Sequence, residues 1–176
     1  MSVLTLKLLN FKKEKTKEEL AKMGDKEAFV ELINENRLNL YKVAKGILRE
    51  EKDIEDAIGN TVMKSFEKIG TLKNPEYFKT WLIRILINEC NLIIRKNKKT
   101  IYLEHNEEGY EDNYKDLDLI KAIDSLEKDL KEVVILYYFQ DMKSEEIGKC
   151  LNINHNTVRT RLYRSKKKLY GILMGE

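Results

Sequence analysis

The chain has 176 residues, of which 42% are hydrophobic and 36% are charged, so it can form one ordinary domain or two small ones. With only 8 Gly and 1 Pro, a fold of strands and tight turns is disfavoured, and helices joined by short polar connections are expected. The net charge of +3 does not by itself indicate a nucleic-acid partner, so the distribution of charge must decide.

Several classes of site find no support in the composition. Cys90 and Cys150 lie outside any C-x-x-C spacing and are predicted to be buried, reduced thiols. The only histidines are His105 and His155; no cluster has metal-ligand spacing, and neither a metal nor a cofactor is expected. The apolar run Met1–Phe11 is too short to span a bilayer. We interpret it as a loose or docking arm of a cytoplasmic protein.

The first half shows two clear helical patterns. Apolar residues recur at three- and four-residue steps from Ala28 to Leu48 and again from Ile54 to Ile69, which predicts two amphipathic helices. Asp53 is the expected N-cap of the second helix, and Gly70 stands where a C-terminal cap is expected.

A proline-containing loop follows at Thr71–Tyr77, and a third helix begins at Phe78. Its apolar positions continue through Ile93, and the basic run from Arg95 to Lys99 ends the domain. We therefore predict an N-terminal helical bundle over residues 18–98.

Residues 99–117 are rich in Asp and Glu and poor in aliphatic side chains, which is typical of a flexible acidic linker. Helical spacing returns at Leu119 and defines a second unit over residues 118–176. The apolar run Val133–Phe139 fits a strand as well as a buried helix by periodicity. Its lead-in from Glu127 is strongly helix-forming and unbroken, which favours the helix. The predicted fold class is all-α, with two small helical domains.

The last forty residues contain a helix-turn-helix pattern. Ser144 is the expected capped start of a short helix that ends at Leu151, and residues 152–154 form a compact turn. A second helix then begins at His155 with Asn154 as its N-cap. Its inward anchors are expected to be Val158, Leu162 and Leu169.

The second helix is basic on one side. From Arg159 to Lys168, six of ten residues are Lys or Arg and none is acidic. A solvated helix usually mixes both signs, so DNA binding is favoured over a merely solvated face. Thr157, Arg161, Arg164 and Lys168 are predicted to share a face suited to phosphate and base contacts. The candidate DNA-binding residues here are His155, Asn156, Thr157, Arg159, Thr160, Arg161, Arg164 and Lys168.

A second set of residues interleaves aromatic and basic side chains beside the proline loop, from Phe78 to Arg84. Aromatic rings can stack on unpaired bases while the cations follow the phosphates of a single strand. Phe78 and Trp81 also fit the core stripe, so the exposed role falls first to Tyr77 and the loop.

These residues resemble those of the extracytoplasmic-function sigma factors of the sigma-70 class. The segment 53–58 resembles the part that docks on the polymerase clamp, and 78–85 followed by Asn88 resembles the promoter-melting helix. Residues 157–164 with Glu146, Ile147 and Leu151 resemble the C-terminal helix-turn-helix. The string 77–81 with 87–90 is also similar to the V-type, cell-envelope-stress branch. The resemblance covers residues 20–98 and 118–170.

The resemblance implies three roles. The first unit would bind core RNA polymerase and the promoter −10 element, and the second would read the −35 element. The acidic linker would thread toward the polymerase active-site and RNA-exit region. A membrane-bound anti-sigma factor is an implied partner, and no small-molecule substrate is expected. The implied −10 set is Lys73, Asn74, Tyr77, Phe78, Lys79, Trp81, Arg84 and Asn88. The implied polymerase set is Asp53, Asp56 and Asn60.

The sequence departs from the family at Gly59 and Asn60, where Gln-Glu is common, so the clamp role rests more on Asp53 and Asp56. Three alternatives stay open. A stand-alone helix-turn-helix regulator would bind operator duplex by itself, usually as a dimer. An enzyme lacks support, because no phosphate loop, metal cluster or nucleophile motif is present. A helical protein that binds an acidic protein surface is the third.

Overall fold

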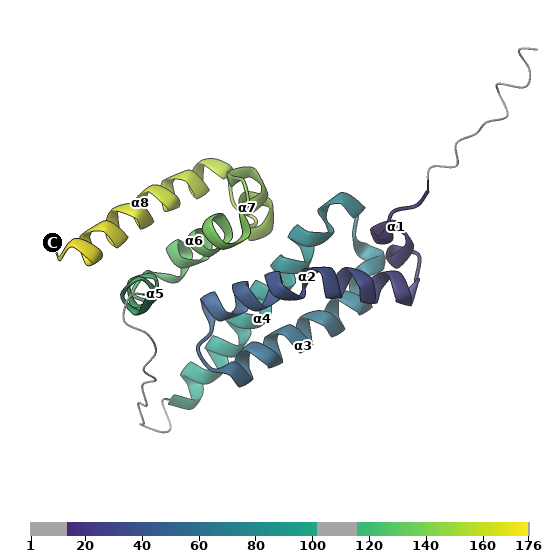
Figure 1. The fold of residues 1–176 in the computed structure, drawn as a ribbon, viewed down its shortest axis with the longest axis horizontal. Coiled ribbons are helices and arrows are strands. Elements are labelled where there is room, and N and C mark those ends of the chain that lie inside the picture. The colour runs from purple at the N-terminus through teal and green to yellow at the C-terminus, as the bar shows by residue number, and fades with distance from the viewer. Residues whose placement is uncertain (1–13, 102–115, 176) are drawn as a thin grey trace, which may run out of the picture.

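The computed structural model describes residues 14–101 and 116–175, and within these ranges the chain is helical and contains no strand. Figure 1 shows the order of the elements. The first half comprises α1 (Lys17–Lys22), α2 (Lys26–Ile47), α3 (Glu51–Lys68), the 3-10 turns η1 (Ile69–Thr71) and η2 (Pro75–Tyr77), and α4 (Phe78–Ile101). The second half comprises α5 (Asp116–Asp124), α6 (Lys128–Gln140), α7 (Ser144–Leu151) and α8 (His155–Met174).

The all-helical prediction is confirmed, including the helical state of the apolar run at 133–139, which lies within α6. The N-terminal arm predicted at Met1–Phe11 lies outside the described residues, and so does the linker between 102 and 115. Helix α4 extends to Ile101, beyond the domain end predicted at residue 98. None of the helices in the described ranges is long and apolar enough to cross a membrane.

The predicted caps of α3 were wrong. The helix begins at Glu51 with Glu50 at the N-cap position, so Asp53 lies inside the first turn. A carboxylate there still suits the positive end of the helix dipole. Asp53 accepts a hydrogen bond from Asn97 Nδ2 at 2.7 Å. At the other end the chain leaves the helix through the 3-10 turn η1, and Gly70 lies within that turn.

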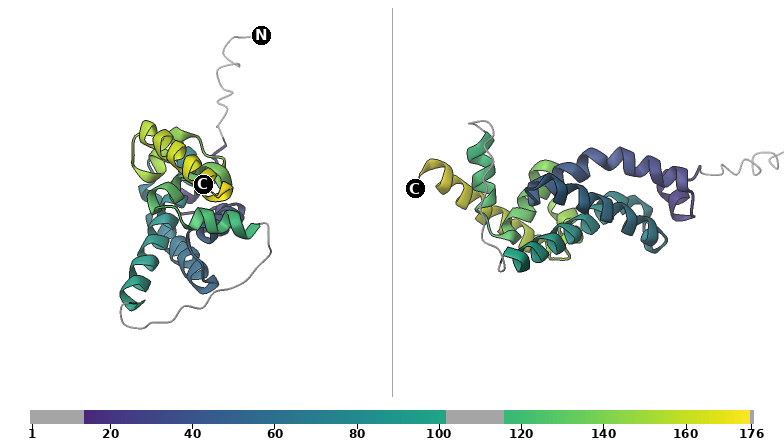
Figure 2. Two further views of the ribbon diagram at one scale, coloured as in Figure 1. Left: turned by 90° about the vertical axis from the view of Figure 1, so that its left-hand side faces the viewer. Right: turned by 90° about the horizontal axis from the view of Figure 1, so that it is seen from below.

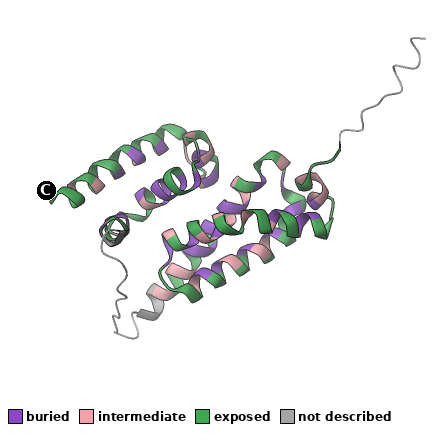
Figure 3. Cartoon of the chain, viewed as in Figure 1, coloured by how far each residue is buried: buried purple, intermediate pink, exposed green. Residues whose placement is uncertain are grey.

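The first half is built on three long helices, α2, α3 and α4, with the short α1 packed against α2 (Figure 1). Their apolar stripes meet in a core, which explains why the three- and four-residue spacing forms these helices. Figure 3 shows the buried positions along the inner sides of the helices and the exposed positions along their outer sides. The fully buried side chains include Leu32, Leu40, Ile54, Leu82 and Leu86.

The second half places α6 beneath the helix pair α7–α8, and α5 crosses near the end of α8. The middle of α6 is almost entirely buried, from Val133 to Leu136. A smaller apolar cluster joins α5 to α6 around Ile123, Leu126 and Leu130, with Leu169 of α8 packed against it.

The two halves share one continuous core rather than standing apart. Helix α6 packs on α2, and α7 packs on α4, as the views of Figures 1 and 2 also show. Both cysteines belong to this shared cluster. They are buried free thiols, as predicted. Burial raises the pKa of Cys90 to about 12 and that of Cys150 to about 12.

Candidate nucleic-acid interface

The turn between α7 and α8 is as compact as the sequence predicts. Asn152 ends α7 in the left-handed conformation with φ 58°, and the Ile153 N–H donates to the Gly148 carbonyl at 2.9 Å. Asn154 is the N-cap of α8, because its Oδ1 accepts from the Asn156 N–H at 2.8 Å. These contacts fix the angle at which α8 leaves the turn.

Gly148 makes this turn sterically feasible. A Cβ atom added at Gly148 would lie 2.9 Å from the Ile153 carbonyl oxygen, closer than van der Waals contact allows. The start of α7 differs from the prediction: Ser144 is the first helical residue, not the cap. The Lys143 N–H instead donates to Glu146 Oε2 at 2.8 Å.

One stripe of α8 anchors it to the second half. Val158, Leu162 and Ser165 are buried, and Leu169 is partly buried in the smaller cluster, so the three predicted apolar anchors are confirmed. The Ser165 hydroxyl donates to the Arg161 carbonyl at 2.8 Å within the helix, and it lies 3.3 Å from the Leu130 carbonyl of α6. The opposite side of α8 therefore faces away from the protein.

That outward side carries hydrogen-bonding, aromatic and basic groups. Tyr163 is 71% exposed although it is a large aromatic residue. At 100° per residue, the positions of the first four turns of α8 that lie farthest from the buried stripe are 156, 160, 163, 164 and 167. The exposed side chains of this face are Asn156, Thr160, Tyr163, Arg164 and Lys167. Amide, hydroxyl and guanidinium groups are the ones that read base edges, and lysines contact phosphates.

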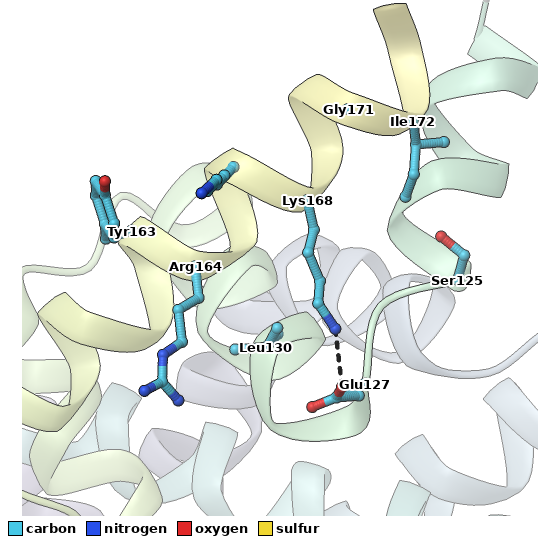
Figure 4. Close-up of a pocket in the computed structure, with 9 residues that line it drawn as sticks. Ser125, Glu127, Leu130, Tyr163, Arg164, Lys168, Gly171 and Ile172 are labelled. Carbon is cyan, nitrogen blue, oxygen red and sulfur yellow. Dashed lines mark hydrogen bonds and ion pairs between the residues drawn. The ribbon is translucent and has the colours of Figure 1, made fainter. Parts of the chain in front are cut away.

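The face predicted from Thr157, Arg161, Arg164 and Lys168 lies partly on a flank of α8, beside the start of α6. Arg161 Nη2 lies 2.5 Å from Asp129 Oδ2, and Lys168 Nζ lies 2.8 Å from Glu127 Oε1. Figure 4 shows Lys168 reaching down from α8 to Glu127 at the rim of a pocket that Arg164 also lines. The hydrogen bond from Lys168 lowers the pKa of Glu127.

Arg159 lies on the opposite flank of α8. Its ion pair is longer than those of Arg161 and Lys168, and its side chain is more exposed than theirs. Its guanidinium is 3.5 Å from Glu145 Oε1, and both side chains are more than half exposed. The Arg161 side chain is only 23% exposed. Exposed pairs of this kind contribute little stability, so Arg159 is freer than Arg161 to contact DNA. His155 and Thr157 are also exposed near the start of the helix.

The aromatic and basic set near η2 is split between surface and core. Asn74 caps η2, with its Oδ1 accepting from the Glu76 N–H at 3.3 Å, and Tyr77 is 41% exposed. Lys149 Nζ, from α7, donates to the Tyr77 hydroxyl at 3.1 Å and lies 4.2 Å from the ring centroid. The exposure expected of Tyr77 is confirmed. Its ring, however, already contacts the ammonium group of Lys149 from the second half.

Phe78 and Trp81 lie deeper. Phe78 is only 2% exposed, so its ring cannot stack on a base without leaving the core. Its centroid is 5.9 Å from that of Trp81, which is partly buried against the same cluster. The structure leaves Tyr77 exposed beside Lys149 and buries Phe78 in the core. The exposed polar members of the predicted −10 set are Lys73, Asn74, Lys79, Arg84 and Asn88.

The predicted polymerase-binding residues share one side of α3. Asp56 and Asn60 are exposed at a four-residue spacing. Asp53 is half-buried and bonded to Asn97 of α4, so part of its acceptor capacity serves the fold. Met63 is 64% exposed one turn further along, and it extends this surface with an apolar side chain.

Sequence reasoning missed Tyr163, Lys167 and Lys149. The first two could have been found by taking the positions opposite Val158 and Leu162 on a helical projection. The contact of Lys149 with Tyr77 joins residues 72 positions apart, and no local pattern signals it.

Comparisons with known proteins match both halves. A family model described as "Sigma-70 region 2" matches residues 32–100, and one described as "Sigma-70, region 4" matches residues 116–169. The RNA polymerase sigma factor SigV of Bacillus subtilis is 34% identical over 151 residues, covering 83% of this chain and 91% of that protein. The ECF RNA polymerase sigma factor SigW of the same organism is 27% identical over 168 residues, covering 84% and 90%.

Solved structures share the fold. CnrH in complex with the cytosolic domain of CnrY has a TM-score of 0.71 at 19% identity, covering 91% of this chain and 96% of that one. RpoE in complex with the anti-sigma factor NepR from Bartonella quintana has a TM-score of 0.71 at 21% identity, covering 83% and 96%.

Proposed function

The chain belongs to the extracytoplasmic-function sigma factors of the sigma-70 class, and from this premise we propose that it binds core RNA polymerase and directs initiation at promoters with defined −35 and −10 elements. It acts as an initiation factor without catalysis of its own. Its place of action is the cytoplasm, and an anti-sigma factor, membrane-bound in the expected arrangement, controls its availability.

The second half, residues 118–176, reads the −35 element in duplex DNA. The outward face of α8 enters the major groove, where Arg159, Thr160 and Arg164 contact base edges and phosphates. Tyr163 adds an apolar ring surface, which suits contact with a thymine methyl group. Arg161 and Lys168 join the contact only when they exchange Asp129 and Glu127 for DNA.

The first half, residues 18–98, binds the −10 element after the strands separate. Tyr77 offers a ring for a base displaced from the stack, and the neighbouring Lys73 and Lys79 neutralise phosphates. Arg84 and Asn88 follow on the exposed side of α4. Phe78 supports the loop from within the core.

Core polymerase binds the exposed side of α3. Asp56 and Asn60 supply hydrogen bonds there, Met63 supplies apolar contact, and Asp53 orients the first turn through Asn97. A surface that mixes acceptors with an apolar side chain is typical of a protein–protein contact.

The observation that carries the proposal is the pairing of two different nucleic-acid surfaces in one chain. An outward basic and aromatic helix suited to duplex DNA lies in the part matched by region 4, and a loop suited to an unpaired strand lies in the part matched by region 2. A regulator that only binds an operator has no use for the second surface.

The test is run-off transcription with bacterial core polymerase, with and without this protein, on a pool of genomic promoter fragments. New transcripts from a defined subset are expected, and their start sites reveal both elements. Tight binding of the protein alone to duplex DNA, with no transcripts, would instead identify an operator-binding regulator.

Two variants test whether transcription depends on the two proposed DNA-binding surfaces. Arg159→Ala is expected to reduce transcription and Tyr77→Ala to impair strand opening, seen as loss of permanganate-reactive thymines around −10. Lys26→Ala is the matched control, because it removes an exposed cation at the start of α2 that belongs to neither proposed surface.

A further inference from the structure

We propose that the pocket lined by α2, α5 and α6 is a binding site for a small amphipathic anion, a carboxylate with a short aliphatic chain. The inference goes beyond the proposed function, because such a site needs neither promoter DNA nor core polymerase. It rests on the volume of the pocket, on its apolar lining and on the cations around it.

The inner part of the pocket is apolar. Its volume is about 250 Å³, and the side chains that line it include Ile120 and Ile123 of α5 and Ile135 and Phe139 of α6. Helix α2 comes close at Gly46, where an added Cβ would be 3.0 Å from Ile135 Cδ1. A space enclosed by such side chains favours a hydrocarbon chain over an ion.

The volume limits the occupant to a small molecule. It corresponds to about eight water molecules at about 30 Å³ each, and a methylene group is of similar size, so a chain of about eight carbons fills it. Ile123 and Ile135 are both less than a tenth exposed. A chain that packs against them is removed from water along most of its length, which is the main driving force for binding.

The charged part of the lining is positive. Three cations of α2 line the pocket, Lys42, Lys45 and Arg49, against a single acid, Asp124 of α5. Asp124 already has two cationic partners, because it forms ion pairs with Arg49 and, at 2.7 Å, with Lys131 of α6. Its charge therefore does not balance the two lysines, and the pocket attracts an anion.

Lys42 and Lys45 are the cations that can receive the anion. Both are exposed, and they lie three positions apart on α2, so they share one side of the helix. Among the described residues Lys42 has no hydrogen-bond or ion-pair partner. Lys45 reaches only Tyr41, whose hydroxyl is 3.5 Å and whose ring centroid is 5.6 Å from its Nζ. A carboxylate bound by these lysines displaces no acid.

The charges behind the pocket also favour a negative head group. Burial and, to a smaller extent, the charge of Arg49 lower the pKa of Lys131 to about 8. These two cations thus repel each other although both pair with Asp124. An added anion relieves this repulsion, whereas an added cation increases it.

The experiment follows the isoleucine δ1 methyl groups of the full chain by NMR while octanoate is added, below the concentration at which it forms micelles. Ile120, Ile123 and Ile135 report on the pocket. Ile54 and Ile147 are fully buried in other helices and serve as internal controls. Octyltrimethylammonium supplies the same chain with a cationic head group, and acetate supplies the head group without the chain.

A charge variant tests the role of the two lysines. Lys42→Gln/Lys45→Gln removes both cations and keeps side chains that suit a helix. The matched control is Lys26→Gln/Lys68→Gln, which removes two exposed lysines of α2 and α3 that do not line this pocket.

Octanoate is expected to shift the three pocket methyl signals saturably and to leave those of Ile54 and Ile147 almost unchanged. Octyltrimethylammonium should bind at least about tenfold more weakly because its charge is repelled, and acetate should give no such shifts. Lys42→Gln/Lys45→Gln should bind octanoate about threefold to tenfold more weakly than the control variant, as the loss of two exposed ion pairs gives.

The absence of saturable shifts at the pocket methyl groups would overturn the inference, and is the result expected if a side chain of a partner protein fills the pocket instead. Equal binding of both octyl compounds, or equal binding of octanoate to both variants, would show adsorption on apolar surface and would also overturn it. Because binding is measured without polymerase or DNA, failure of the proposed function would not alter this result.

Discussion

The outward face of α8 and the loop at η2 each combine an aromatic ring with cations, but they differ in what already touches them. Tyr163 is 71% exposed, whereas Tyr77 is 41% exposed beneath Lys149. The acids near α8 pair with its flanks and leave its outward line open. The proposed −35 surface is thus open in the free chain, whereas Tyr77 of the proposed −10 surface has to lose its contact with Lys149 before a base can stack on it.

The difference follows from the kind of packing behind each surface. Helix α8 is anchored by a stripe on its own half, through Val158 and Leu162. The loop at η2 lies against α7, which belongs to the other half. A surface supported from within its own unit can stay exposed, whereas one that bridges two units depends on how those units are arranged.

The largest expected effect comes from distorting the turn between α7 and α8, which sets the direction of α8. In Gly148→Ala the new methyl group meets the Ile153 carbonyl at 2.9 Å. The overpacking costs about 1–3 kcal/mol, against a gain of about 1 kcal/mol in helix propensity. Discrimination between −35 sequences should be lost in run-off assays while opening of the −10 region is retained on supercoiled templates. Unchanged −35 discrimination would mean that the turn does not set the reading angle.

The next effect concerns the two flanking arginines. Arg159→Ala is expected to reduce discrimination at one −35 position by about 1–3 kcal/mol, the value of a bidentate base contact. Arg161→Ala is expected to cost less, because the wild-type Arg161 must first leave Asp129 at 2.5 Å. Competition binding with point-mutated −35 duplexes, using polymerase reconstituted with each variant, measures both. The reverse order of effects would place the reading face on the α6 side of α8.

A bulky side chain inserted between the two halves, at the contact of α2 with α6, is expected to weaken their packing. Gly46→Leu introduces a better helix former into α2 but also inserts a side chain against Ile135. Because Cys90 and Cys150 lie in the shared core, their alkylation by maleimide at pH 8 should become about tenfold faster or more, as a shift of about 1.4 kcal/mol in an opening equilibrium gives.

The control for this substitution is Gly59→Leu, where an added Cβ meets nothing within 4 Å. It should leave the thiols as protected as in the wild type. Equal rates in the wild type, Gly46→Leu and unfolded protein would show that the free chain is already open.

The smallest effect is electrostatic. Lys167→Ala removes one exposed cation from the outward face of α8. If Lys167 contacts one phosphate, the slope of log K against log salt for promoter binding should fall by about 0.9, with all −35 sequences weakened alike. A sequence-dependent loss would assign Lys167 to a base instead.

Much of the second half could be predicted because its signals are local. The turn residues Asn152 and Asn154, the apolar stripe of α8 and the start of α8 at His155 all follow from neighbours within a few positions. The prediction of the α3 N-cap was wrong because the local signal is ambiguous. Three acids, Glu50, Glu51 and Asp53, lie near the start of this helix, and the sequence does not show which one lies outside it.

The contacts that modify the site could not be predicted, because they join distant segments. Asp129 and Glu127 pair with Arg161 and Lys168 on one flank of α8 from 32 and 41 residues away, so the helix sequence alone could not show that these two cations already have acidic partners. The docking of Tyr77 on Lys149 likewise depends on how the two halves pack, which periodicity within each half does not specify.

Site-specific photo-crosslinking in the complete complex with core polymerase and promoter shows directly whether the two surfaces bind two different promoter elements. A photo-reactive amino acid is placed at Lys166 on α8 or at Glu76 beside Tyr77, two exposed positions next to the proposed contacts. We expect the first position to cross-link around −35 and the second around −10 of the same promoter, about 25 base pairs apart. Cross-links from both positions to one site, or cross-links from Lys166 that form equally well without polymerase while Glu76 gives none, would contradict it.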